Sequence, residues 1–97
     1  MIAFELRPAA AADVEEAALW YESQETGLGV QFLDAFRATM ESIAENPKQY
    51  GIAYRDTRRA LIRRFPYGIY YRLERDRVLV VARMHGRRQP TRWQSRT

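Results

Sequence analysis

The chain has 97 residues, which is enough for one compact domain with a single hydrophobic core and leaves no room for a second core. Hydrophobic residues make up 46% of it and charged residues 29%, the balance of an ordinary globular domain rather than of a disordered segment. The absence of cysteine excludes a disulfide framework, a thiolate nucleophile and a zinc–thiolate cluster.

The net charge of +4 hides an uneven distribution of charge along the chain. Residues 1–50 carry three basic and nine acidic side chains, a net charge of −6, whereas residues 51–97 carry thirteen arginines and three acids, a net charge of +10. This segregation raises the affinity of the second half for an anionic surface. A nucleic acid and an acidic protein segment both provide such a surface, and charge alone does not choose between them.

The first half has the pattern of one strand followed by two helices. Alternation of apolar with small or polar side chains over residues 2–7 predicts a short, half-buried strand. Strong helix formers predict a first helix over about residues 9–25, which Gly27 is expected to end. A second helix is predicted over about residues 29–45, and the short link between the two helices makes them an antiparallel hairpin. The expected apolar stripe of the second helix consists of Leu33, Phe36, Met40 and Ile43.

The second half reads as sheet, because β-branched, aromatic and arginine residues replace the helix formers. Strands are predicted over residues 60–62, 69–74 and 78–85, with turns at residues 65–68 and 76–77. We therefore expect an α+β protein with an N-terminal strand, a two-helix hairpin and a three-stranded antiparallel sheet, the helices covering one face of that sheet. Residues 1–97 are expected to form a single domain with an acidic helical half and a basic sheet half.

The last strand contains the strongest candidate for a chemical site. Unbroken alternation puts Arg83 and His85 on the sheet face that the helices leave open, near Arg87 and Arg88 in the following loop. A histidine titrates near neutral pH and can move a proton, and the planar guanidinium of arginine pairs with phosphate or carboxylate. The alternative is that His85 caps the strand end and that the arginines are solvated. The opposite face of this strand is expected to meet the helices through Val78, Val80, Ala82 and Met84.

Several aromatic and acidic side chains allow two interpretations. Three tyrosines interleaved with arginines can stack on bases or can pack in the core, and Trp20 can pack on the sheet or border a groove for a partner. The acids of the first helix are expected to form its solvated face. The tyrosines are Tyr67, Tyr70 and Tyr71, next to Arg63, Arg64 and Arg72, and the acids are Asp13, Glu15, Glu16, Glu22 and Glu25.

No cofactor, metal ion or membrane is expected to take part in the function. His85 is the single histidine, and the basic half supplies only Asp56, Glu74 and Asp76 as further metal ligands. A glycine-rich phosphate-binding loop is missing as well. The longest strongly apolar run, over residues 78–82, is far shorter than a membrane span, and no signal peptide is visible. A cytoplasmic protein is the resulting expectation.

A series of short motifs, in order from about residue 3 to residue 93, resembles the RelE/ParE superfamily of toxins from bacterial type II toxin-antitoxin systems. The motifs are Ala-Asp-Val-Glu-Glu-Ala with Trp20-Tyr21-Glu22, Gly27-Leu28-Gly29 with Phe32-Leu33, Ile43 to Pro47, Arg64-Phe65-Pro66-Tyr67 with Ile69-Tyr70-Tyr71, and His85 with Arg88 and Trp93. The resemblance implies a small toxin that arrests growth and stabilises plasmids. It also implies a cognate antitoxin, encoded nearby, whose tail wraps the helices and the sheet.

The superfamily divides into two mechanisms, since RelE-like members cut messenger RNA on the ribosome and ParE-like members poison DNA gyrase. Arg59 and Arg88 fall where RelE-like ribonucleases have basic residues, but Gly68 stands near an expected arginine and Trp93-Gln94 at an expected tyrosine. Tyr-Tyr-Arg at 70–72 and Arg-Met-His at 83–85 resemble the ParE-like branch more closely. We therefore expect a ParE-like toxin that binds its target without catalysis, with gyrase as the leading candidate.

Two alternatives remain open at this point. One is an RelE-like ribonuclease acting on ribosome-bound messenger RNA, in which His85 moves the proton while Arg83 and Arg88, with Arg59, hold the scissile phosphate. The other is a degenerate, non-toxic interaction module. In either toxin, the residues expected to bind target or antitoxin are Arg59, Arg63, Arg64, Arg72, Arg83, Arg88 and Trp93, and acids of the antitoxin are expected to face Arg63, Arg72 or Arg83.

Overall fold

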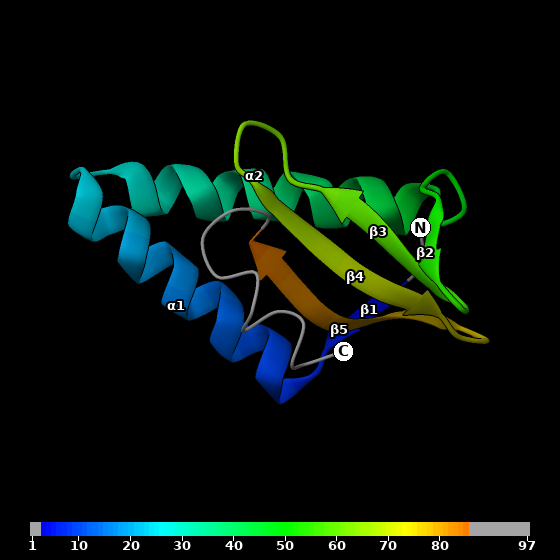
Figure 1. Cartoon of the computed structure of the whole chain (residues 1–97). Coiled ribbons are helices and arrows are strands. Elements are labelled where there is room, and N and C mark those ends of the chain that lie inside the picture. The colour runs from blue at the N-terminus through cyan, green and yellow to red at the C-terminus, as the bar shows by residue number, and fades with distance from the viewer. Residues whose placement is uncertain (1–2, 86–97) are drawn as a thin grey trace.

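The computed structural model describes the backbone of residues 3–85 and the side chains of residues 3–81. Its helices and strands confirm the predicted order and the α+β class, with one strand more than expected (Figure 1). The elements are β1 (Ala3–Leu6), α1 (Pro8–Gln24), α2 (Leu28–Glu45), β2 (Ile52–Tyr54), β3 (Thr57–Leu61), β4 (Tyr67–Leu73) and β5 (Arg77–His85).

The strands form one mixed sheet in the order β1-β5-β4-β3-β2. The predicted three-stranded antiparallel sheet is its centre, and two short strands extend it at the edges. β1 pairs with β5 in parallel, from Ala3 opposite Arg77 to Leu6 opposite Val80, so the first and last strands of the described chain are neighbours. β2 was not predicted, because its three residues are all exposed and carry no alternation of apolar and polar side chains.

The helical hairpin is held together at its turn by a side chain of α1. The carboxylate of Glu22 accepts hydrogen bonds from the backbone N–H groups of Gly27 and Gly29, at 3.0 and 2.9 Å. These two bonds lower the pKa of Glu22, since they stabilise the charged form. The prediction that Gly27 ends the first helix is wrong in detail: α1 ends at its cap Glu25, and Gly27, with φ of +89°, begins α2.

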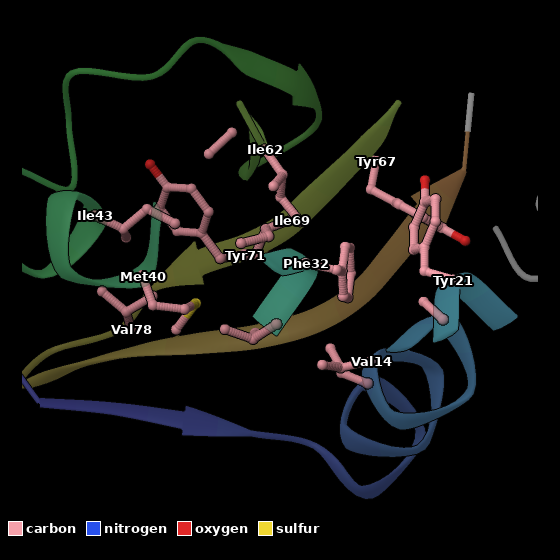
Figure 2. Close-up of a cluster of buried hydrophobic side chains, with 14 residues drawn as sticks. Val14, Tyr21, Phe32, Met40, Ile43, Ile62, Tyr67, Ile69, Tyr71 and Val78 are labelled. Atoms are coloured by element: carbon pink, nitrogen blue, oxygen red, sulfur yellow. The ribbon is translucent and has the colours of Figure 1, made fainter. Parts of the chain in front are cut away.

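Aromatic rings form one end of the core between the hairpin and the sheet (Figure 2). Tyr21 of α1, Phe32 of α2, Phe65 and Tyr67 have ring centroids 4.9–5.7 Å apart, and most of these pairs are edge-to-face. Aliphatic side chains and Tyr71 form the other end in the same view. The aliphatic residues of the core include Val14, Met40, Ile43, Ile62, Ile69, Val78 and Val80.

Buried Tyr71 also fastens the chain that leaves α2. Its hydroxyl donates a hydrogen bond to the backbone carbonyl of Pro47 at 2.6 Å. Burial raises the pKa of this phenol, and the charge of Arg58 opposes the rise. Tyr71 is therefore protonated and able to donate at neutral pH.

The structure shows where the aromatic side chains lie, and it corrects the predicted exposure of one residue in each helix. Tyr67 and Tyr71 are packing residues of the core, Tyr70 is buried on the other face of the sheet, and Trp20 packs partly buried against the core. Asp13 is only 3% exposed, so the prediction that it belongs to the solvated face of α1 is wrong. Leu33 was expected in the apolar stripe of α2, but it is exposed and its neighbour Phe32 is buried, because position 32 lies one helical turn before Phe36 and is in line with Met40 and Ile43.

Candidate functional site

One face of the sheet is not covered by either helix, and we call it the open sheet face. Along each central strand, side chains that point toward the hairpin alternate with side chains that point to this face. Those that point toward the hairpin are Ala60 of β3, Ile69 and Tyr71 of β4 and Val78 of β5. The register of the strands puts the residues between them on the opposite side. The open sheet face is therefore formed by Thr57, Arg59, Leu61, Gly68, Tyr70, Arg72 and Leu79, of which Arg59 and Leu61 are exposed and Gly68, Tyr70 and Leu79 are buried.

The side chain of Arg59 lies along this face and crosses β4 at Gly68. A Cβ atom built on Gly68 would stand 3.3 Å from Cγ and 3.4 Å from Cδ of Arg59. Gly68 stands near the position where the resemblance to RelE-like ribonucleases leads us to expect an arginine. In this chain, the missing side chain leaves room for the aliphatic part of Arg59, so that Arg59 supplies a guanidinium to this face.

The acids at the β1 and β4 ends of the sheet bind another arginine. Arg77 contacts Glu5 of β1 at 3.0 Å and Glu74, just after β4, at 3.5 Å. Within the described part of the chain, Arg59 and Arg72 make no ion pair, and the Nε atom of Arg72 is buried without a hydrogen-bond partner. Two guanidinium groups without an acidic partner therefore lie on the open sheet face, that of Arg59 exposed and that of Arg72 half-buried, and an anion can pair with them there.

A second basic surface lies at the other side of β3, where the sheet meets α2, and we call it the edge groove. It is a depression of about 790 Å³ with one wall on α2 and the other at the end of β3. Arg63 and Arg64 lie in the turn between β3 and β4, are exposed, and line the groove. The remaining lining residues are Gln31, Asp34, Ala35, Ala38, Thr39, Ser42, Tyr50 and Leu61.

The predicted binding residues are therefore divided between two surfaces. Arg59 and Arg72 share the open sheet face, whereas Arg63 and Arg64 belong to the edge groove. The predictions for Arg88 and Trp93 lie outside the described residues. Of Arg83 and His85 the structure describes the backbone, as part of β5.

A β-bulge in β5 interrupts the alternation from which the position of Arg83 and His85 was predicted. Tyr71 pairs with Val80, but its neighbour Tyr70 pairs with Ala82, so β5 has one residue more than β4 at this point. Beyond the bulge, Arg83 is the register partner of Ile69 and His85 that of Tyr67, both of which face the helices. Strict alternation therefore does not hold across residues 80–82, and the catalytic role of Arg83, His85 and Arg88 stays a prediction.

The edge groove was missed in the sequence, although α2 contains a signal for it. Gln31, Ala35, Ala38 and Ser42 recur every three or four residues, which puts them on one side of the helix. The short side chains among them leave space beside the helix. The apolar stripe next to them dominates the sequence pattern and obscures this signal.

Comparison with known proteins assigns the family. A family model described as the ParE toxin of type II toxin-antitoxin systems, parDE, matches residues 4–90. The chain belongs to the ParE toxin family. The match covers almost the entire sequence and confirms the resemblance to the RelE/ParE superfamily and the closer relation to its ParE-like branch.

A solved structure supports the fold of this ParE family member. A chain described as the chromosomal ParDE toxin-antitoxin system from P. aeruginosa superposes with a TM-score of 0.65, covering 88% of this chain and 96% of that chain. The two sequences are 16% identical, so this likeness concerns the fold. A search of curated proteins finds no match.

Membership in the ParE family makes the chain a toxin of the type II toxin-antitoxin class. In the described part of the chain, no three histidine, aspartate or glutamate side chains come together as metal ligands. Neither helix there is long and apolar enough to cross a membrane.

Proposed function

We propose that this ParE family member arrests growth by binding an essential cytoplasmic target through its open sheet face, and that an antitoxin encoded beside it neutralises it. DNA gyrase is the leading candidate for the target. The observation that carries the proposal is the pair of uncompensated guanidinium groups of Arg59 and Arg72 on a face that no helix of the described chain covers.

The charges fit binding rather than a buried reaction centre. Arg59 is exposed and its stem is supported by Gly68, so its guanidinium is available to an anionic partner at little cost in side-chain order. Arginine pairs with carboxylates of a protein and with phosphates of DNA through the same planar geometry. A complex of gyrase with DNA presents both chemistries.

Expression of the chain without its antitoxin tests the proposal. We expect growth arrest, inhibition of supercoiling by purified gyrase and accumulation of gyrase-dependent DNA breaks, all reduced in the double variant Arg59→Ala/Arg72→Ala. Arg75→Ala, an exposed arginine in the turn between β4 and β5, is the matched control and is expected to retain activity. Normal growth on expression of the wild-type chain would contradict the proposal and favour a non-toxic module.

The same purified protein distinguishes the ribonuclease alternative from the binding of gyrase. Cleavage of ribosome-bound messenger RNA by the purified protein, with gyrase activity unchanged, would replace gyrase by messenger RNA as the target. His85→Ala and Arg83→Ala would then abolish toxicity while preserving the fold. Full toxicity of both variants would exclude catalysis by these residues.

A further inference from the structure

The turn between β2 and β3 holds Arg55 in a backbone conformation that arginine seldom adopts. Tyr54 and Thr57 are register partners, so the turn consists of Arg55 and Asp56. Arg55 has a φ of +54°, in the left-handed region that favours glycine. Glycine, asparagine and aspartate are the usual residues with positive φ in a two-residue hairpin turn. Because strained residues often mark functional sites, the side chain of Arg55 is a candidate for binding a ligand.

Arg55 stacks on an exposed aromatic ring. Its guanidinium carbon lies 5.3 Å from the centroid of the Tyr54 ring, the distance of a cation–π contact. Tyr54 is 61% exposed, whereas the three tyrosines for which the sequence allowed base stacking are buried. Of the tyrosines in the sheet, Tyr54 is therefore the one whose ring a ligand can reach.

The register of the strands puts Tyr54 on the open sheet face, in one row with Arg72. Tyr54 pairs with Thr57, and Thr57 pairs with Arg72. Register partners point to the same face of a sheet. Arg59, two residues after Thr57, is the diagonal neighbour of Arg72, a spacing of about 7–8 Å in an antiparallel pair. One exposed aromatic ring and the guanidinium groups of Arg59 and Arg72 therefore share this face.

The surroundings of this row favour an anion. β2, β3 and β4 are neighbours in the sheet, and in Figure 1 no helix of the described chain lies in front of them. Asp56, in the same turn, is exposed and contributes one negative charge. Arg55, Arg59 and Arg72 contribute three positive charges and make no ion pair within the described part of the chain. The net charge along the row is therefore positive, and an anionic ligand is attracted to it.

A single-stranded nucleic acid provides both chemistries that this row can bind. Its phosphates pair with guanidinium groups, and an unpaired base presents a flat face to an aromatic ring. In a duplex, the neighbouring base pairs cover the faces of each base, so a stacking ring favours single strands. An acidic peptide supplies the negative charge but no flat ring for Tyr54.

We propose that the open sheet face, extended by Tyr54 and Arg55, binds a single-stranded segment of nucleic acid. A base stacks on the ring of Tyr54, which Arg55 supports from the other side, and phosphates pair with Arg59 and Arg72. The inference rests on the proposed function and deepens it, because it names the nucleic acid of the gyrase–DNA complex, rather than the protein, as what this face contacts.

Fluorescence anisotropy with the purified full chain tests the inference. The probe is a labelled oligonucleotide of thymidines, about ten nucleotides long, which is within the site size of single-strand-binding folds. The corresponding RNA, a duplex of the same length and a glutamate-rich peptide are measured beside it. We expect the chain to bind the single strands more tightly than the duplex and the peptide at physiological ionic strength.

Variants of Tyr54 and Arg59 separate the stacked base from the phosphates. Tyr54→Leu is expected to weaken binding of the thymidine oligonucleotide by about tenfold and to keep its salt dependence, whereas Tyr54→Phe keeps the ring and the affinity. Arg59→Ala weakens binding and lowers the slope of log affinity against log salt by about 0.7, the effect of one lost phosphate contact. Arg37→Ala, at an exposed arginine of α2, is the matched control and keeps the affinity and the slope of wild type. Thermal unfolding verifies that every variant is folded.

Arg55→Gly separates a binding role from a structural one. Glycine adopts a positive φ without strain, which offsets its greater freedom in the unfolded chain, so the melting temperature is not expected to fall. The affinity for the thymidine oligonucleotide is expected to fall, because the ring of Tyr54 loses its support and the row loses a positive charge. A residue that only stabilised the turn would give the opposite pair of results.

The outcomes separate this inference from the proposed function. Unchanged affinity in Tyr54→Leu or in Arg55→Gly overturns the inference. Tighter binding of the duplex or of the glutamate-rich peptide also overturns it, the peptide in favour of an acidic protein segment. Tighter binding of RNA than of DNA supports a single-stranded ligand and replaces DNA by messenger RNA as its source. Growth arrest and gyrase inhibition without binding of any oligonucleotide overturn the inference alone, and oligonucleotide binding without growth arrest supports it and overturns the proposed function.

Discussion

The aliphatic stem of Arg59 lies across the backbone of Gly68, with Cγ 3.3 Å from the point that a Cβ atom would occupy. Gly68→Ala is therefore expected to displace the arginine while leaving the strand intact, because the flexible stem gives way more easily than the backbone. We predict a free energy of unfolding within about 1 kcal/mol of wild type, by chemical denaturation, and weaker growth arrest. Unaltered toxicity would show that the orientation of Arg59 is unimportant.

The turn of the hairpin should be sensitive to a single methyl group. A Cβ on Gly29 would lie 2.7 Å from the carbonyl oxygen of Ala18, a backbone atom that cannot move without displacing α1. Gly29→Ala should therefore lower the free energy of unfolding by about 1–3 kcal/mol. Gly51→Ala is the matched control, because nothing lies within 4 Å of a Cβ there. Equal stability of the two variants would contradict this account of the hairpin.

Acid should weaken the same turn through Glu22. The pKa of Glu22 is lowered by the two amide hydrogen bonds, so its contribution to stability is present above the ordinary carboxylate pKa and is lost as pH falls through the lowered value. We expect Glu22→Gln to have a lower melting temperature than wild type at neutral pH and the difference to shrink in acid. A difference that stays constant from neutral to acidic pH would mean that the charge of Glu22 does not contribute.

Tyr71 offers a test of the contact between β4 and the chain after α2. Tyr71→Phe removes the part-buried hydrogen bond to the carbonyl of Pro47 and leaves that carbonyl without this donor. The free energy of unfolding should therefore fall by about 1 kcal/mol. Tyr54→Phe, at a tyrosine that is 61% exposed, should change it very little. Urea denaturation of both variants and of the wild-type chain measures these free energies. An equal loss of stability in the two variants would contradict a stabilising role for the Tyr71 hydrogen bond.

The large elements and the family could be read from the sequence, whereas local departures from regularity could not. Both helices and the three central strands follow from periodicity, and the resemblance carried by scattered motifs agrees with the family match. The bulge between residues 80 and 82 of β5 has no signal in a run of valine and alanine, although it changes the register partners of Arg83 and His85. β2 was missed for a related reason, since exposed residues at a sheet edge have no apolar period.

The division of the arginines between two surfaces was equally beyond the sequence. Arg59, Arg63 and Arg64 lie within six residues, and the strand predicted over residues 60–62 ends between them, but the sequence does not indicate which way the chain turns after that strand. The turn after Leu61 sends Arg63 and Arg64 toward α2, while Arg59 remains on the sheet. The separation depends on the direction of this turn, for which the residues after Leu61 carry no periodic signal.

The parallel pairing of β1 with β5 has a consequence for synthesis on the ribosome. β1 emerges before both helices, yet its partner residues 77–80 are made more than 70 residues later. Contacts between distant segments form late, so β1 waits while the hairpin and the antiparallel strands assemble. The open sheet face includes Leu79 of that same strand. The open sheet face, and with it the proposed binding of the target, can therefore form only after synthesis has passed β5.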